Sequence, residues 1–470
     1  MAWEVVIGLE THVELSTKTK IFCSCSTAFG GEENSQCCPV CTGMPGALPV
    51  FNRSVLDFSL RTALALNCKV NTYQRFDRKN YFYPDLPKAY QISQLYLPMG
   101  EEGYVDLEGK RIRIRELHME EDAGKLTHLD KHSRVDFNRC GVPLIEIVTY
   151  PDFRTAEEVV EYLEKLKSML EYLGVSDCKM EEGSLRCDVN LSVRPVGSDT
   201  LGVRTEMKNL ASFRAITKAI EYESRRQIAL LERGREVELE SRRWDEEKEL
   251  TFSMRTKESA RDYRYFPDPD LPPITLTEDE VRLAQQSLPE FADARIARYE
   301  KDYSLPSYDC KLLTLQPAVA EFFEACVALG APAKTVSNWI LGDLFRLQKE
   351  HKLEGKELGI TPEFLVSIIG MVEQRRINLG TAAQVLKAIF RTGTDPVTYV
   401  KEQGLEQIED TSLVESAVRQ TMADHPNAVA DYRAGKTKSF GFLVGQTMRS
   451  LKGQGDPAAV NQILRQLLEE

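Results

Sequence analysis

A proline-rich segment, residues 266–273, separates two parts of the chain that differ in hydrophobic periodicity. Before it, several runs alternate apolar and polar residues, which is the pattern of half-buried strands. After it, apolar residues recur mostly with the helical period, for example over 277–288, 317–329, 362–374 and 381–390. Proline lacks a backbone donor and restricts the residue before it, so this segment ends regular structure. The sequence therefore predicts an α+β unit followed by helical units.

Length and a second change in composition indicate more than two domains. A chain of 470 residues exceeds one ordinary domain. Near 395–410 the helical pattern is interrupted, and the helical segment that follows is more basic in its middle. We expect domains over residues 1–292, 293–405 and 406–470.

Bulk properties narrow the class of protein. No run of about 18 apolar residues is present, and the N-terminus lacks the basic and apolar regions of a signal peptide. We therefore expect a cytoplasmic protein whose eleven cysteines are thiols or metal ligands rather than disulfides. The net charge of −12 argues against indiscriminate coating of nucleic acid, but it leaves room for local basic patches.

The segment 156–173 predicts a helix with both ends marked. Thr155 to Glu158 fit a capping box, and Gly174 stops the helix. The predicted apolar stripe consists of Val159, Leu163, Leu166, Leu170 and Leu173.

The N-terminal segment 4–15 predicts a strand with one charged face. Side chains alternate along a strand, so Glu10, His12 and Glu14 point away from the apolar set Val5, Ile7, Leu9 and Val13. Neighbours on one face lie about 7 Å apart, a spacing at which two ligands can embrace one cation. The alternative is an edge strand with a solvated face.

Three further segments repeat this combination of acids and cations. Segments 185–193 and 202–208 predict strands with polar faces, and 111–115 predicts a strand that leads into three acids in a row. Solvated outer faces are the alternative, and the pattern leaves open which of Glu120 and Glu121 faces inward. Several such rows on one sheet would be costly without a shared metal or phosphate, so together they predict a Mg²⁺–nucleotide site. The polar residues are Arg186, Asp188, Asn190 and Ser192 in the second segment, Arg204, Glu206 and Lys208 in the third, and Glu120, Glu121 and Asp122 in the last.

Five cysteines fall within 19 residues near the N-terminus. Cys38 and Cys41 have the spacing of a zinc knuckle, and Cys23 and Cys25 can complete a tetrahedral site. Four thiolates leave no open position, so we expect a structural rather than a catalytic Zn²⁺. Small buried thiols are the alternative, and Cys37 could replace a neighbour.

Two other regions suit contacts with nucleotide or nucleic acid. The loops 76–87 and 255–266 combine cations with aromatic residues, which can grip phosphate or stack on bases, although ordinary packing explains them equally well. Residues 431–452 hold five Lys or Arg residues against one Asp, a local charge of +4 that favours selective RNA docking.

Taken in order, these motifs closely resemble the B subunits of bacterial tRNA-dependent amidotransferases (GatB) along essentially the whole chain. The matching stretches are 6–15, 76–84, 117–125, 141–148, 180–190, 206–210, 262–267 and 441–446. The resemblance implies a glutamine synthetase-like cradle domain, then a helical domain and a helical tail. It also implies ATP-dependent amidation of Glu or Asp mis-attached to tRNA(Gln) or tRNA(Asn), through phosphorylation of the side-chain carboxylate.

The resemblance also implies which residues form the site. Mg²⁺ or Mn²⁺ would be held by Glu10, His12 and Glu121, with Asp188 and Glu206 as further ligands or supporting groups. Imidazole is an unusual Mg²⁺ ligand, so His12 either binds atypically or positions substrate. From charge and position we infer that phosphate is contacted by Lys79, Arg186, Lys208 and Asn190. The tail would hold the tRNA through Lys436, Lys438, Gly445, Gln446, Arg449 and Lys452.

The resemblance also implies partners. No Gly-x-Ser-x-Gly elbow and no Ser–Lys amidase signature is found, so we expect ammonia from the amidase (A) subunit, with a small C subunit completing a heterotrimer. Two features depart from the family: Ala211 stands where the family usually has Asn, and the cysteine cluster is not universal. Two rival readings are a ligase acting on a small free acid and a non-catalytic tRNA-binding scaffold.

Overall fold

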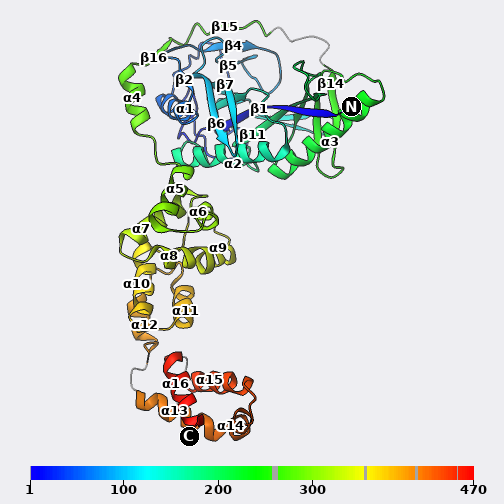
Figure 1. Ribbon diagram of the computed structural model, residues 1–470. Coiled ribbons are helices and arrows are strands. Elements are labelled where there is room, and N and C mark those ends of the chain that lie inside the picture. Colours follow the sequence, from blue (N-terminus) through cyan, green and yellow to red (C-terminus); the bar gives the residue numbers. More distant parts are fainter. Residues whose placement is uncertain (1, 257–262, 354–356, 408–410, 452–453, 470) are drawn as a thin grey trace. The chain divides into compact units, whose positions relative to one another are not determined.

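The computed structural model describes residues 2–256, 263–353, 357–407, 411–451 and 454–469. The chain divides into two compact units, Met1–Phe291 and Ala292–Glu470. The first unit is mixed α and β, and the second is helical (Figure 1). The predicted three-domain division remains a proposal.

Within the described residues, nine strands of the first unit form one sheet in the order β14-β13-β12-β11-β1-β10-β7-β6-β2. Strand β1 lies in the middle and pairs antiparallel with both β10 and β11. β12 and β13 pair in parallel, and the other neighbours are antiparallel. The strands are β1 (Trp3–Glu14), β2 (Lys69–Val70), β6 (Gly100–Leu107), β7 (Lys110–Glu121), β10 (Pro143–Thr149), β11 (Leu185–Pro195), β12 (Thr205–Lys208), β13 (Glu240–Asp245) and β14 (Leu250–Thr256).

Smaller sheets and one further helix complete the first unit. A three-stranded sheet has the order β15-β4-β5, and β16 pairs with β3 and β8 with β9. Helix α4 (Glu278–Gln286) begins with a capping box between Thr277 and Glu280. The short strands are β3 (Tyr73–Gln74), β4 (Asp77–Asn80), β5 (Tyr90–Ser93), β8 (Lys125–His128), β9 (Ser133–Asp136), β15 (Phe266–Pro267) and β16 (Ile274–Thr275).

Three helices, α1 (Arg53–Ala65), α2 (Ala156–Leu173) and α3 (Phe213–Glu232), bury the apolar face of the large sheet. Ile7, Leu9 and Val13 of β1 enter the same core as Leu185, Cys187, Val189, Leu191 and Val193 of β11, so the predicted alternation of both strands is confirmed. The charged faces of these strands therefore lie on the side away from the helices.

Helix α2 confirms its predicted stripe, with all five apolar residues at most 4% exposed. Thr155 caps the helix by accepting from the N–H of Glu158, and Gly174 ends it in the left-handed conformation. The reciprocal bond of the predicted capping box is shifted by one residue, since the Glu158 carboxylate accepts from the N–H of Arg154 at 2.7 Å.

A β-bulge in β7 resolves the ambiguity between Glu120 and Glu121. The register with β10 slips between Glu116 and Ile114, so that no residue of β10 lies opposite Arg115. Ile112 and Ile114 face the core before the bulge, whereas Leu117 and Met119 face it afterwards. His118 and Glu120 consequently face the charged side of the sheet, and Glu121 does not.

The second unit contains two separate hydrophobic cores. One is built by α5 to α12 and centres on Phe323, Ile340 and Leu386, and the other is built by α13 to α16 and centres on Val418, Leu443 and Leu464. Among the described residues, no helix has the length and apolarity needed to span a membrane. The helices are α5 (Ala292–Tyr303), α6 (Ser307–Leu313), α7 (Pro317–Ala328), α8 (Ala333–Trp339), a π-helical turn (Ile340–Leu344), α9 (Phe345–Glu350), α10 (Pro362–Glu373), α11 (Leu379–Ile389), α12 (Pro396–Glu402), α13 (Thr411–Asp424), α14 (Pro426–Arg433), α15 (Lys438–Ser450) and α16 (Pro457–Glu469).

Candidate functional site

A row of polar side chains crosses four adjacent strands on the charged face of the sheet. His118 of β7 lies opposite Glu146 of β10, Glu146 lies opposite His12 of β1, and His12 lies opposite Arg186 of β11. The antiparallel register fixes this order, because directly opposed residues point to the same face.

His12 lies between two carboxylates. Its Nε2 is 3.7 Å from Oε1 of Glu120 and 3.6 Å from Oε2 of Glu146, and His118 Nε2 is 3.0 Å from the same oxygen of Glu146. Burial opposes protonation of His12, but Glu146 and Glu120 outweigh it and raise its pKa to about 9. The three ligand atoms of His12, Glu120 and Glu146 lie within 4.8 Å of one another, close enough to surround one cation.

A second group of acids lies beside this row: Glu10 of β1 and Asp188 of β11 are opposed two residues from His12 and Arg186, and Glu206 is on β12, the next strand. One carboxylate oxygen each of Glu10, Asp188 and Glu206 falls within 4.8 Å of the others. Burial and the neighbouring acid Glu146 raise the pKa of Glu10, although the Asn190 amide opposes this by donating to its Oε1 at 3.0 Å. The Lys208 ammonium lies 2.5 Å from Asp188 and 3.1 Å from Glu206. The Lys208 ammonium therefore already balances part of the negative charge that a divalent cation would otherwise balance.

Ser241 of β13 orients one member of this second group. Its hydroxyl donates to Oε2 of Glu206 at 2.6 Å, and the two residues are opposed in the parallel pair β12–β13. Ser241 is 2% exposed, so this hydrogen bond is shielded from water.

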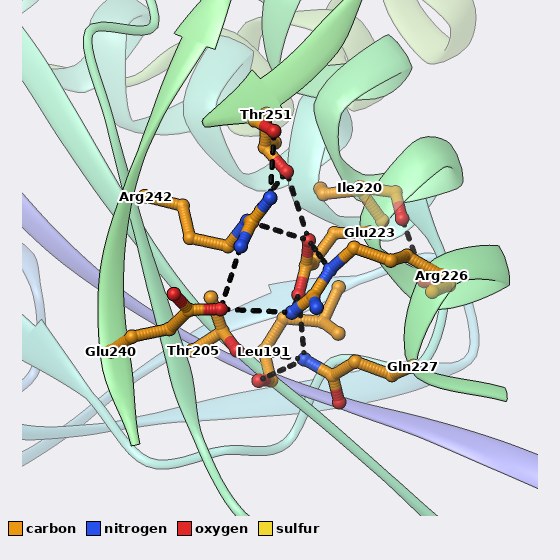
Figure 2. A network of polar contacts seen from close by, with 10 residues as sticks. Leu191, Thr205, Ile220, Glu223, Arg226, Gln227, Glu240, Arg242 and Thr251 are labelled. Carbon is orange, nitrogen blue, oxygen red and sulfur yellow. Dashed lines mark hydrogen bonds and ion pairs between the residues drawn. The ribbon is translucent and has the colours of Figure 1, made fainter. Parts of the chain in front are cut away.

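A buried ion-pair network links helix α3 to β13, the strand that carries Ser241, and to the edge strand β14 (Figure 2). Glu223 of α3, which is fully buried, accepts from Arg226 at 2.6 Å and from the Thr251 hydroxyl at 3.1 Å. Arg226 and Arg242 both contact Glu240, at 3.3 and 2.7 Å. These contacts tie α3, β13 and β14 together beside the site.

Cations surround both groups of acids. Lys79 of β4 has a raised pKa, because Glu120, Tyr265 and Glu146 outweigh its burial, and its Nζ lies 5.3 Å from the ring centre of Tyr263. Among the described residues Lys79 forms no ion pair, and Glu120 and Glu146 stabilise its charge from a greater distance. Arg186 donates to Asp122 at 2.6 Å, and its Nε is buried without a partner in the described structure.

Glu121 is separated from the residues with which the resemblance grouped it. Its carboxylate accepts from the N–H of Ile92 at 2.9 Å and contacts the Lys88 ammonium at 2.6 Å. Adjacent strand residues point to opposite faces, so Glu121 cannot share the face of Glu10 and His12. Glu120, rather than Glu121, lies beside His12 in the described structure, and the metal-binding role of each residue stays a prediction.

A cavity of about 600 Å³ opens next to these groups. Glu14, Arg186 and Asp188 line it, together with Arg139 and Ala211. Burial and the nearby Asp122 raise the pKa of Glu14 to about 8, against the opposing effect of Arg186. A charged polyphosphate or carboxylate substrate fits this combination of size and polarity better than an apolar ligand does.

The four predicted zinc ligands converge in space. The Sγ atoms of Cys23, Cys25, Cys38 and Cys41 lie within 4.8 Å of one another, and those of Cys38 and Cys41 are 3.9 Å apart. Tetrahedral Zn–S bonds of about 2.3 Å require sulfur atoms about 3.8 Å apart, so the donors fit Zn²⁺. A hydrogen bond from Cys23, helped by the Cys38 N–H, lowers the pKa of Cys41 to about 4 against the effect of burial.

The two loops predicted to contact nucleotide, 76–87 and 255–266, differ in part from the prediction. Residues 77–80 form a strand rather than the predicted loop, and Arg78 is paired with Asp268 and Asp270 at 2.8 Å each. Of the loop 255–266, residues 257–262 lie outside the described residues.

In the tail, one face of α15 is both basic and open. Lys438, Gly445 and Arg449 are exposed and recur at helical spacing. A side chain added at Gly441 or Gly445 would meet nothing within 4 Å. Gln446 is half-buried, Lys436 is paired with Asp431 at 2.9 Å, and Lys452 lies outside the described residues.

Four residues of the site were missed or left unassigned by the sequence reasoning: Glu120, Glu146, His118 and Ser241. Glu146 had a usable signal, because it is the one acid in the apolar strand 143–149 and an unpaired buried carboxylate is costly. Ser241 had none, since its role depends on the parallel pairing of β12 with β13.

The chain matches two families of known proteins. The GatB/GatE catalytic domain matches residues 5–282, and the GatB domain matches residues 321–468. The chain is 54% identical to the B subunit of the aspartyl/glutamyl-tRNA(Asn/Gln) amidotransferase of Caldicellulosiruptor saccharolyticus, over all of both chains. It is 51% identical to the protein of that name from Lachnoclostridium phytofermentans, over all of this chain and 99% of the relative, and 50% identical to that from Thermoanaerobacter pseudethanolicus, over all of both.

Proposed function

Because the chain belongs to the family of Asp/Glu-tRNA(Asn/Gln) amidotransferase B subunits, we propose that it amidates Glu or Asp mis-attached to tRNA, using ATP to activate the side-chain carboxylate. The observation that carries this proposal is the charged face of the sheet. Two groups of side chains that could each hold a cation lie there, near Lys79 and Arg186. Asp188 of one group and Arg186 also line the 600 Å³ cavity.

The proposed chemistry has two steps. An oxygen of the substrate carboxylate attacks the γ-phosphorus of ATP, and ADP leaves. Ammonia then attacks the carbonyl carbon of the acyl phosphate, loses a proton and displaces inorganic phosphate, so that Gln or Asn remains on the tRNA. Activation is needed because a carboxylate oxygen is a poor leaving group until it carries phosphate.

The residues divide the work by charge. Glu10, Asp188 and Glu206 on one side, and His12 with Glu120 and Glu146 on the other, would hold Mg²⁺, which neutralises phosphate oxygens when it is bound. Lys79, Arg186 and Lys208 would contact phosphate oxygens and stabilise the charge that develops during transfer. Asn190 keeps Glu10 oriented through its amide.

We assign a structural Zn²⁺ to the four converging thiols, because all four are protein ligands and no position stays open for substrate. Metal analysis of the purified protein after extensive dialysis tests this assignment. One zinc per chain is expected, and a chain without zinc would exclude it.

The exposed face of α15 is the proposed tRNA contact. Lys438 and Arg449 supply charge, and Gly441 and Gly445 let a phosphate backbone approach the helix closely. Lys436 and Gln446 belong to the same proposed surface, and the predicted contact of Lys452 lies outside the described residues.

Ammonia is proposed to come from a partner amidase, with a small third protein in the complex. The chain alone should therefore use NH₄⁺ but not glutamine. Glutamine-dependent product from the purified single chain would refute this division of labour.

One experiment tests the proposed reaction against its rivals. The purified chain is incubated with Glu-tRNA(Gln), ATP, Mg²⁺ and NH₄⁺, and the amino acid released from the tRNA is identified. Gln is the expected product. ADP formed only when a free acid is supplied would indicate a small-molecule ligase, and tRNA binding without turnover would indicate a scaffold. Asp-tRNA(Asn) in a parallel reaction tests the second substrate.

A further inference from the structure

Lys20 is a lysine buried without an acidic partner. The residue is 0% exposed. Its ammonium contacts the Phe137 carbonyl oxygen at 3.2 Å and Sγ of Cys41 at 3.6 Å. Within the described residues it forms no ion pair, and Glu121, an acid that lines the same small cavity, is committed to Lys88 at 2.6 Å.

Such a position is unfavourable unless a negative charge compensates it. Burying an unpaired ammonium costs several kcal/mol, and one backbone carbonyl does not balance a full charge. The nearby source of negative charge is the group of four cysteines, which Lys20 contacts through Cys41. A Zn²⁺ bound by four thiolates carries a net charge of −2, so the ammonium and the metal centre compensate one another.

We propose that Lys20 is the built-in counter-cation of the tetrathiolate zinc site, donating to Cys41 and reducing the net charge of the centre to −1. This inference rests on the proposed zinc assignment and adds a fifth residue to that site. Hydrogen bonds to metal-bound sulfur withdraw charge from it and hold the ligand in place. The Lys20 ammonium donates a charged hydrogen bond to Sγ of Cys41. The N–H of Cys38, 3.2 Å from the same sulfur, donates a neutral one.

The same contacts connect the zinc site to the sheet. Lys20 and Ile21 hold both ends of the segment 137–141, which precedes β10. Lys20 donates to the Phe137 carbonyl, and the Ile21 N–H donates to the Gly141 carbonyl at 3.0 Å. The Gly141 N–H in turn donates to the Asp122 carbonyl at 2.9 Å. Loss of the counter-cation should therefore loosen the metal first and the segment 137–141 afterwards.

The test is zinc affinity of the full chain with Lys20→Met, which keeps the length of the side chain and removes its charge. Lys18→Met, at an exposed position two residues away, is the matched control. Competition with a chromophoric zinc chelator at neutral pH gives the affinities. We expect Lys20→Met to bind zinc about 10- to 100-fold more weakly than the wild type and Lys18→Met to be unchanged.

Replacement of zinc by Co²⁺ gives a second readout that global stability does not move. The thiolate-to-cobalt charge-transfer band should shift to longer wavelength in Lys20→Met, because sulfur donates more readily without the ammonium. If Lys20→Met fails to fold by circular dichroism, Lys20→Gln takes its place with the same expected losses, since its amide is neutral but can still donate to Phe137.

The outcomes separate this inference from the zinc assignment. A wild-type chain without zinc removes both. A wild-type chain that holds zinc, with a Lys20 variant of equal affinity and an unshifted cobalt band, overturns the role of Lys20 alone.

Discussion

Glu120 and Glu121 are adjacent in sequence, yet their replacement by Gln should have opposite consequences. Glu120→Gln removes one carboxylate from the group around His12 while preserving its shape. It also relieves repulsion from Glu146, so the folded state should change in stability by only about 1 kcal/mol. Amidation of Glu-tRNA(Gln) with NH₄⁺ should fall about 100-fold, which corresponds to about 2.7 kcal/mol of lost transition-state stabilisation.

Glu121→Gln should instead destabilise the first unit. The Lys88 and Glu121 side chains are 11% and 3% exposed and 2.6 Å apart, so the variant leaves a buried ammonium unpaired. Breaking a buried pair costs about 3–5 kcal/mol, and the lower end applies because an amide oxygen can still accept from the Ile92 N–H. A loss of about 3 kcal/mol lowers Tm by roughly 5–10 °C.

Both variants should be measured by thermal unfolding and by ammonia-dependent amidation at a temperature at which each is folded. Glu108→Gln, in the exposed turn between β6 and β7, serves as control. Wild-type activity of Glu120→Gln, together with an inactive but fully folded Glu121→Gln, would refute the assignment of the two faces.

Three further variants test other parts of the proposal. His12→Ala should lower ammonia-dependent amidation at fixed Mg²⁺, and unchanged turnover would remove His12 from the site. Ser241→Ala should reduce amidation about tenfold by releasing Glu206, with stability lowered by about 1–2 kcal/mol; a loss of stability without any loss of turnover would contradict the positioning role. Lys438→Ala with Arg449→Ala should weaken tRNA binding and flatten its salt dependence, because two phosphate contacts are lost, and an unaltered salt slope in a filter-binding titration would count against α15 as the RNA surface.

Much of the fold could be predicted from the sequence because it depends on local periodicity. The core faces of β1 and β11 followed from alternation alone, and the ends of α2 followed from Thr155 and Gly174. The zinc knuckle spacing of Cys38 and Cys41 predicted by itself that these two thiols lie together. In each case the constraint acts between residues that are close in sequence.

Sequence by itself determined which side chains share a face of an uninterrupted strand such as β1 or β11; only the tertiary structure decided where a bulge changes that phase and which strands lie side by side. A bulge at Arg115 shifts the phase of β7 and brings Glu120, rather than Glu121, to His12. The register of β10 supplies Glu146 from a segment far along the chain, and the parallel pairing of β12 with β13 supplies Ser241. Strand order and register are set by hydrogen bonds between distant segments, and no local pattern contains them.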